Sequence, residues 1–308
     1  MKARVIKSTG SWYTVLNGNM DVVDCRMKGN IRLKGSRSTN PIAVGDIVDF
    51  EMEANSAQGI IIAIDERKNY IIRKSINLSK KSHVLAANVD HAFIMATVST
   101  PRTPYGFIDR MLVTAEAYSI SASIILNKSD TWNEKDLKLA KEMIETYTKV
   151  GYQIQSMSSV NEQEVQQLKP FLKGKVSLLI GHSGTGKSTL INMLNHNLNI
   201  KTAAISEVHL QGKHTTTFAE MHPIENDTFI IDSPGIREFG LIDMNKSELG
   251  HYFPEIRAKL NQCRFNNCLH INEPGCAVKD AVELEEIPFT RYRSYVSMIE
   301  GETEEAFD

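Results

Sequence analysis

Short alternations of apolar and polar residues follow one another along the first 70 residues, separated by turn-forming pairs such as Asn17-Gly18 and Lys34-Gly35. A period of two predicts strands that are half buried in a sheet, and Gly and Asn typically punctuate such strands. The predicted strands are Trp12–Leu16, Val22–Arg26, Asp46–Glu51 and Gly59–Asp65. Several short strands in so few residues favour a small β-barrel of OB type at residues 1–70, a fold often used on single-stranded nucleic acid.

After a linker predicted at residues 71–88, apolar strands alternate with amphipathic helices over residues 89–243. This alternation predicts an α/β domain with a mostly parallel sheet that helices cover on both faces. The predicted strands are Ala92–Val98, Ser123–Leu126, Gln153–Ser156, Val176–Ile180 and Thr228–Ile231, and the predicted helices are Ile108–Tyr118, Glu134–Val150, Glu162–Leu172 and Lys187–His196. A third, mostly helical domain is expected at residues 244–308, with a closing helix at Glu283–Glu300.

The 308 residues suffice for two or three domains, and no apolar run reaches the roughly 18 residues of a membrane span. The N-terminus has no apolar stretch of signal-peptide length, so we expect a cytoplasmic protein. The net charge of −2 hides an asymmetry, because residues 1–89 hold 14 Lys/Arg and 8 Asp/Glu whereas the rest hold 21 and 29. This basic third suggests contact with a polyanion, although a solvated surface is the alternative. The densest basic cluster is Lys28, Arg32, Lys34 and Arg37.

The segment Gly181–Ser188 matches the phosphate-loop pattern G-x-x-x-x-G-K-[ST] at every fixed position, between a predicted strand and a predicted helix. Its glycines allow backbone N–H groups to surround phosphate oxygens at a helix N-terminus. Lys187 is expected to reach the β- and γ-phosphates and to assist catalysis, and the Ser188 hydroxyl to bind Mg²⁺. The predicted phosphate-binding residues are Gly181, His182, Ser183, Gly184, Thr185, Gly186, Lys187, Ser188, Thr189 and Gly235.

The tetrapeptide Asn127-Lys128-Ser129-Asp130 follows a predicted strand and has the form Asn-Lys-x-Asp. The carboxylate of Asp130 can accept two hydrogen bonds from guanine, whereas adenine would leave it unpaired. Together with the phosphate loop, this motif predicts GTP rather than ATP. The next loop contains Ser158 and Ser159, which would support the base or else only cap a helix.

Two further segments have the character of nucleotide switches. Asp232-Ser-Pro-Gly235 fits Asp-x-x-Gly, where the aspartate serves Mg²⁺ and the glycine N–H senses the γ-phosphate. In Gly212–Thr217 we favour Thr216 as a further Mg²⁺ ligand. Ile236 stands where Ras-like GTPases place a water-orienting glutamine, so slow intrinsic hydrolysis is expected. His214 is the internal candidate to position water, although contact with a partner would also explain it.

Three cysteines and one histidine crowd together near the C-terminus. Cys263, Cys268, His270 and Cys276 form a tetrahedral Zn²⁺ donor set with no position left open for catalysis. Reduced cysteines packed in a helical cap are the alternative, as is ligation by the more distant His251. Cys25 stands alone and is expected to be a small buried hydrophobe.

The base motif precedes the phosphate loop, so the five GTPase motifs occur in a rotated order. With Gly212–Thr217 and Glu273-Pro-Gly-Cys-Ala277, the chain resembles the RsgA (YjeQ/YloQ) family of circularly permuted, small-subunit-dependent GTPases over nearly its whole length. The resemblance implies an OB-fold domain, a structural Zn²⁺ at the four positions above, and GTP hydrolysis stimulated by the small ribosomal subunit during its late maturation. The small subunit and its rRNA are the expected partners. An RNA-binding protein with purely structural nucleotide binding and a nucleotide kinase are the alternatives, and we expect a monomer.

Overall fold

The computed structural model describes residues 1–29, 41–74, 82–198, 200, 219–233 and 245–301. The chain forms two compact units. One comprises residues 1–93 and 159–240, and the other comprises residues 94–158 and 241–308. Within the described ranges, no helix is both long enough and apolar enough to cross a membrane.

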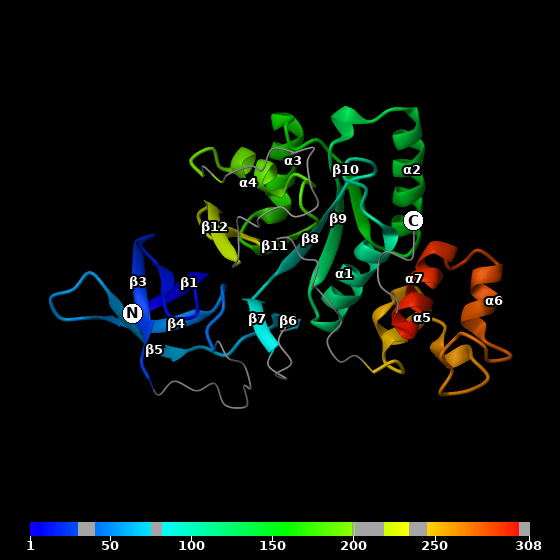
Figure 1. The fold of residues 1–308 in the computed structure, drawn as a ribbon, viewed down its shortest axis with the longest axis horizontal. Coiled ribbons are helices and arrows are strands. Elements are labelled where there is room, and N and C mark those ends of the chain that lie inside the picture. Colours follow the sequence, from blue (N-terminus) through cyan, green and yellow to red (C-terminus); the bar gives the residue numbers. More distant parts are fainter. Residues whose placement is uncertain (30–40, 75–81, 199, 201–218, 234–244, 302–308) are drawn as a thin grey trace. The chain divides into compact units, whose positions relative to one another are not determined.

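The first unit begins with a closed five-stranded barrel (Figure 1, blue). Its strands are β1 (Lys2–Ser8), β2 (Tyr13–Asn17), β3 (Val22–Met27), β4 (Ile47–Met52) and β5 (Gly59–Ile64). β1 pairs antiparallel with both β2 and β4, and β3 pairs parallel with β5, which closes the sheet. The barrel expected from sequence is thus confirmed, and Cys25 is fully buried in its core beside Phe50 and Val15.

One glycine is required by this packing. A Cβ on Gly59 would lie 2.8 Å from the Cys25 sulfur and 2.9 Å from the Phe50 ring. Both neighbours are held in the barrel core, so a side chain at residue 59 would displace that core.

The stretch assigned to the linker contains two strands, β6 (Tyr70–Lys74) and β7 (Ser82–Ala87), which pair antiparallel. Ile71, Ala86 and Ala87 are buried, which explains why this otherwise polar stretch adopts regular structure. An isolated bridge joins Val44 to Ala86, so the pair is attached to the barrel.

The first unit also holds the phosphate-loop part of the α/β domain. Parallel strands β11 (Val176–Ile180) and β13 (Thr228–Asp232) are accompanied by helices α3 (Glu162–Leu172) and α4 (Lys187–Leu194). β12 (Glu220–Glu225), which was not predicted, pairs antiparallel with β13 and, through Glu220 opposite Lys7, with β1 of the barrel. β8 (His91–Ala96) starts in this unit beside β11.

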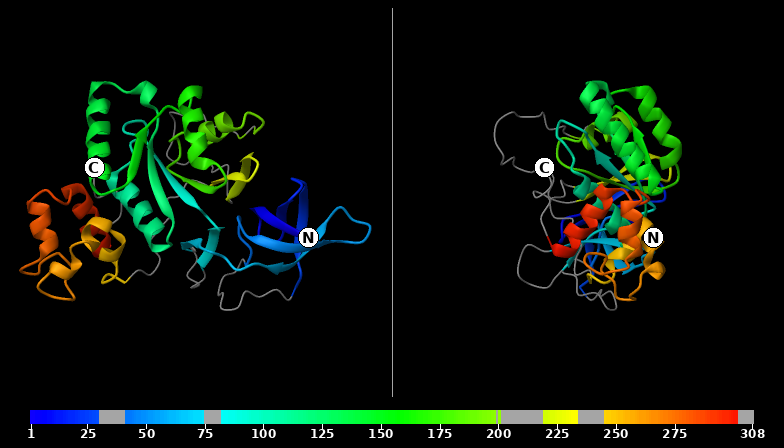
Figure 2. Two further views of the ribbon diagram at one scale, coloured as in Figure 1. Left: turned by 180° about the vertical axis from the view of Figure 1, so that it is seen from behind. Right: turned by 90° about the vertical axis from the view of Figure 1, so that its right-hand side faces the viewer.

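The second unit contains the end of β8, the parallel strands β9 (Ser121–Leu126) and β10 (Gln153–Ser156), and helices α1 (Tyr105–Ala117) and α2 (Glu134–Lys149) (Figure 1 and Figure 2, green). Its C-terminal part consists of helices α5 (Pro254–Arg257), α6 (Ala277–Glu283) and α7 (Phe289–Glu300). Short 3₁₀ turns lie at Ser129–Thr131, Leu249–Tyr252 and Leu260–Gln262. Val113 of α1 belongs to the same buried cluster as Phe253 and Tyr295, so α1 and the C-terminal helices share one core.

The prediction of a single closing helix at Glu283–Glu300 is wrong. α6 ends at Glu283, and α7 begins only at Phe289. Pro288 precedes the first turn of α7, and a proline disfavours helical backbone at the residue before it. Ile287, next to the break, is buried in the C-terminal core and anchors the turn.

A buried ionic cluster joins α7 to α1 and α5. The guanidinium of Arg291 donates to Asp109 (Nη1–Oδ1, 2.7 Å) and to Glu255 (Nε–Oε1, 2.7 Å). The Arg291 and Asp109 side chains are completely buried, and Tyr147 of α2 donates its hydroxyl to Asp109 at 2.9 Å. Because removing Arg291 would leave two buried carboxylates without their cation, this cluster holds the C-terminal helices on α1.

Candidate nucleotide and metal sites

The phosphate loop connects β11 to α4 as predicted. Gly184 and Gly186 have φ values of +83° and +101°, a backbone conformation that glycine adopts readily. The Lys187 ammonium group donates to the carbonyl oxygens of Gly181 (2.7 Å) and His182 (2.9 Å), so its side chain lies back along the loop. Burial lowers the pKa of Lys187, and the neighbouring Asp232 opposes that shift.

Asp232 ends β13 directly opposite Leu179, next to the start of the phosphate loop. Ser233 donates its hydroxyl to the Leu179 carbonyl oxygen at 2.8 Å, which ties the Asp-x-x-Gly segment to β11. Burial raises the pKa of Asp232 to about 6, Glu220 adds to the shift and Lys187 opposes it. Among the described residues, no donor reaches the buried Asp232 Oδ1. A buried carboxylate oxygen beside a phosphate loop suits hydrated Mg²⁺, so the donor chemistry fits this ion.

Four of the five predicted base-binding residues lie in the second unit, and Ser159 is the first residue of the next segment, which belongs to the first unit. Asn127 is buried and donates its N–H to the Ala96 carbonyl oxygen at 2.8 Å. Lys128 has a left-handed backbone (φ +67°) and donates its ammonium group to the Thr100 carbonyl oxygen at 2.7 Å. Asp130 is exposed, and its carboxylate accepts a short hydrogen bond from the Ser158 hydroxyl. This contact links the tetrapeptide to the predicted serine loop, in which Ser159 is also buried.

The remaining switch residues fall outside the described ranges. These are His214, Thr216, Gly235 and Ile236. Their assignments stay predictions, as does the choice among the basic residues Arg32, Lys34 and Arg37.

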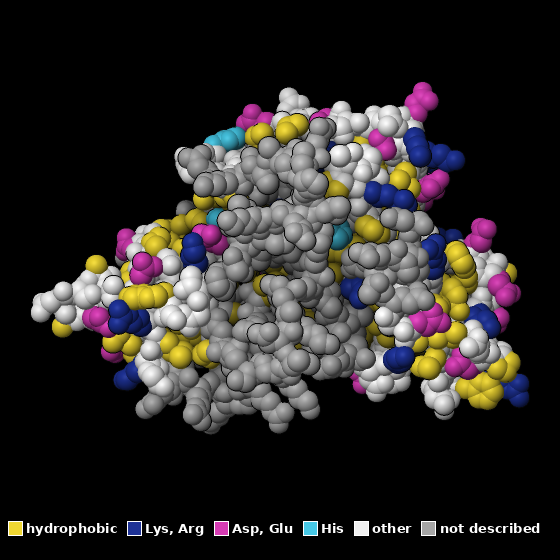
Figure 3. All heavy atoms as spheres, viewed as in Figure 1, with side chains coloured by type: hydrophobic (Ala, Val, Ile, Leu, Met, Phe, Trp, Pro, Cys, Tyr) yellow, Lys and Arg dark blue, Asp and Glu magenta, His cyan; other side chains and the backbone are white. Residues whose placement is uncertain are grey.

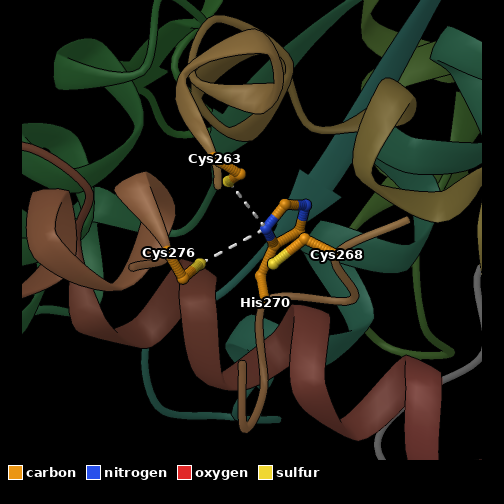
Figure 4. Close-up of side chains that lie close together, drawn as sticks. All are labelled: Cys263, Cys268, His270 and Cys276. Carbon is orange, nitrogen blue, oxygen red and sulfur yellow. Dashed lines mark hydrogen bonds between the residues drawn. The ribbon is translucent and has the colours of Figure 1, made fainter. Parts of the chain in front are cut away.

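The predicted metal ligands meet at one point in the second unit (Figure 4). One ligand atom from each of Cys263, Cys268, His270 and Cys276 lies within 4.8 Å of all the others. His270 Nδ1 is 3.5 Å from the Cys263 sulfur and 3.4 Å from the Cys276 sulfur. Zinc bond lengths of about 2.0 Å to nitrogen and about 2.3 Å to sulfur place such atoms about 3.5 Å apart in a tetrahedron. The residues therefore fit a tetrahedral metal ion.

The electrostatics of this cluster also suit a cation. Burial and the Cys276 and Cys263 sulfurs raise the pKa of Cys268 to about 12, although the His270 N–H opposes the shift. Three adjacent thiolates thus need a positive charge among them. His251, the alternative ligand, is not part of the four-residue cluster.

A carboxylate that the sequence reasoning left without a role supports the ligand-bearing loop. Glu273 accepts hydrogen bonds from the N–H groups of Leu269, Ile271 and Asn272. These bonds lower the pKa of Glu273 to about 2, and the bond from Leu269 contributes most. Partial burial opposes the shift. The only sequence signal was its place in Glu273-Pro-Gly-Cys-Ala277.

Comparison with known proteins agrees with this arrangement. The chain matches the family model for the RsgA GTPase over residues 64–242 and that for the RsgA N-terminal domain over residues 2–61. The small ribosomal subunit biogenesis GTPase RsgA of Flavobacterium johnsoniae is 52% identical over 99% of this chain and 94% of its own length.

Two solved structures have the same fold over most of the chain. The crystal structure of YjeQ from Thermotoga maritima superposes with a TM-score of 0.77 and 32% identity, covering 97% of both chains. YloQ, described as a circularly permuted GTPase, superposes with a TM-score of 0.72 and 28% identity over 97% of this chain and 94% of its own. By its motifs, its fold and these relatives, the chain belongs to the RsgA family of GTPases.

Proposed function

We propose that this GTPase acts on the small ribosomal subunit, hydrolysing GTP in a subunit-stimulated way late in subunit maturation. The observation that supports this proposal is the buried Lys187 next to Asp232, whose pKa is raised. The curated relatives of the chain are named small ribosomal subunit biogenesis GTPases. A role at this subunit places the protein in the cytoplasm.

In this proposal the phosphate loop holds the triphosphate through its backbone N–H groups and Lys187. Lys187 leaves its two loop carbonyl oxygens for phosphate oxygens, a change its flexible stem permits. Ser188, Thr216 and Asp232 hold Mg²⁺, which neutralises charge on the phosphates when bound, and the Gly235 N–H senses the γ-phosphate.

Guanine is selected by the carboxylate of Asp130, which accepts from the ring N–H and the exocyclic amine. The Ser158 hydroxyl, already bonded to that carboxylate, limits its rotation so that both oxygens are available in one orientation. Asn127 and Lys128 hold the turn through Ala96 and Thr100. Ser159 completes the loop beneath the base.

Hydrolysis depends on orienting the attacking water. Because Ile236 cannot do this, we propose slow turnover by the protein alone, with His214 positioning water when the small subunit is bound. The four-residue cluster holds one Zn²⁺, whose bonds to three thiolates and one imidazole stabilise the loop that carries them.

The basic barrel end contacts rRNA in this proposal. Of the net charge of +6 in residues 1–89, three positive charges lie in residues 30–40 and two in residues 75–81, and neither stretch contains Asp or Glu. Over the described surface on the face in Figure 3, basic and acidic side chains are mixed. Arg32, Lys34 and Arg37 are therefore the residues to test first.

The test is GTP turnover by the purified protein with and without purified small subunits. We expect strong stimulation, loss of turnover in Lys187→Ala and loss of stimulation in His214→Ala. GTP binding without stimulated turnover would instead favour the alternative, an RNA-binding protein in which the nucleotide is structural. Turnover that the subunits leave unchanged would contradict the assigned partner.

A further inference from the structure

The loop between Cys268 and Cys276 is organised around one carboxylate. Glu273 Oε1 accepts from the Leu269 N–H at 2.9 Å, and Oε2 accepts from the N–H groups of Ile271 and Asn272 at 3.0 and 3.1 Å. Both oxygens are therefore engaged, and all three donors belong to the turn that carries His270.

This turn has a backbone that needs support. His270 has φ +59°, a left-handed conformation that is uncommon for residues other than glycine. Of the four successive N–H groups of residues 269–272, those of Leu269, Ile271 and Asn272 have the Glu273 carboxylate as their acceptor. Without Glu273, three of them would lose their partner.

The carbonyl side of the same turn is held by α7. Tyr292 donates its hydroxyl to the His270 carbonyl oxygen at 2.7 Å, and Tyr295 donates to that of Leu269 at 3.0 Å. The peptide planes on either side of His270 are thus fixed from two directions. This restricts where its imidazole can point.

We propose that Glu273 is a positioning residue of the metal site. It holds the 269–272 turn so that His270 Nδ1 faces the sulfurs of Cys263 and Cys276. This inference rests on the proposed metal binding and deepens it, because it assigns part of the metal affinity to a residue that does not touch the ion. Outer partners of this kind typically change metal affinity by about 10- to 100-fold when removed.

The geometry explains why glutamate is needed. Glutamine has the same length but only one acceptor oxygen, and its NH₂ group would face backbone N–H donors at one side of the turn. Aspartate is one methylene shorter and would not reach all three donors. Glu273→Gln is therefore a nearly isosteric probe, and Glu283→Gln, an exposed carboxylate at the end of α6, is its matched control.

The experiment titrates the full chain, freed of metal by a chelator, with Co²⁺, whose thiolate charge-transfer and d–d absorption report the donor set. We expect Glu273→Gln to weaken Co²⁺ binding by about 10- to 100-fold and to change the d–d bands, with Glu283→Gln unchanged. Urea unfolding of metal-free and Zn²⁺-loaded protein completes the test. If Glu273 positions the ligand, Glu273→Gln lowers the urea midpoint more in the Zn²⁺-loaded protein than in the metal-free protein. If its role is merely structural, the variant lowers the two midpoints equally.

Two outcomes separate this inference from the metal proposal. If wild type and Glu273→Gln bind Co²⁺ with the same affinity and spectrum, the role of Glu273 is overturned while the metal site stands. If wild type binds neither Co²⁺ nor Zn²⁺, both are overturned. Should Glu273→Gln fail to fold, Tyr292→Phe removes one carbonyl contact of the same turn, and unchanged Co²⁺ affinity and bands there would count against the positioning of His270.

Discussion

In its proposed role at Mg²⁺, the buried carboxyl group of Asp232 would make nucleotide binding sensitive to pH. Its pKa of about 6 exceeds the ordinary 3.8 because burial, aided by Glu220, disfavours the charged form. Since the folded protein without nucleotide favours the neutral form of Asp232 more than the unfolded chain does, this group stabilises the nucleotide-free fold at low pH. That contribution is lost as the pH rises through 6.

Magnesium requires the ionised form, so the expected trend in binding has the opposite sign. We predict that affinity for Mg²⁺·GTP is nearly constant above pH 7 and falls below pH 6, by at most about tenfold per pH unit. Fluorescent-nucleotide titrations between pH 5 and 8 would measure this. In the Asp232→Asn variant, affinity for Mg²⁺·GTP should be low at every pH. The fall in affinity below pH 6 that this carboxyl group causes should be absent. An identical pH profile in both proteins would contradict the prediction.

Among the helices, the attachment of α7 depends on charge balance in the Arg291 cluster. One guanidinium faces two carboxylates, Asp109 and Glu255, in a buried position. Arg291→Met leaves both carboxylates without their cation, so we expect a loss of about 3–5 kcal/mol in the free energy of unfolding. Asp109→Asn leaves the Glu255 pair intact and should cost less, about 1–3 kcal/mol.

Urea unfolding at fixed metal content would give both values. Arg257→Met is the matched control, because Arg257 is half exposed and its pair with Glu116, at 3.3 Å, is a surface contact worth about 0–1 kcal/mol. Equal costs for Asp109→Asn and Arg291→Met would show that charge balance does not govern this contact.

The elements that sequence predicted are those with an uninterrupted pattern. β11 is five apolar or small residues directly before a glycine loop, and α2 is an amphipathic helix whose start is capped by Asn133. β12 was missed because Pro223 interrupts a run of mixed polarity, and its place depends on pairing with β13 and β1 rather than on its own residues. The break before α7 was missed because the helical periodicity continues across Pro288.

The sites divide in the same way. The candidates for the phosphate loop, the base motif and the metal ligands could be named from the sequence because the spacing of such motifs along a chain is fixed by chemistry. The roles of Glu273 and Ser158 depend on which backbone or side chain folds against them, and no spacing encodes that.

For the molecule as a whole, the charge asymmetry predicts how binding to the subunit responds to salt. Arg32, Lys34 and Arg37 lie in residues 30–40, which contain no acidic residue. If each neutralises one phosphate, replacing all three by glutamine should lower the slope of log K against log salt by about 3 and weaken binding. Filter binding to purified subunits at several salt concentrations would measure this.

The matched control replaces Lys135, Lys138 and Lys141, exposed on α2, by glutamine. It removes the same charge from another part of the surface. If this control lowered the slope of log K against log salt as much as the replacement of Arg32, Lys34 and Arg37 does, the effect would come from net charge rather than from a local contact.

The distance along the chain between Asp109 and Arg291, 182 residues, has a consequence for how the protein is made. The barrel residues are all translated within the first 64 positions and can close early, because domains fold as units from the N-terminus during synthesis. α1 leaves the ribosome long before α7, with Asp109 still lacking its cation and Val113 lacking its apolar cover. The unit that holds the Asn127–Asp130 tetrapeptide is therefore the last to be completed, and a nascent chain acquires it only when α7 has been translated.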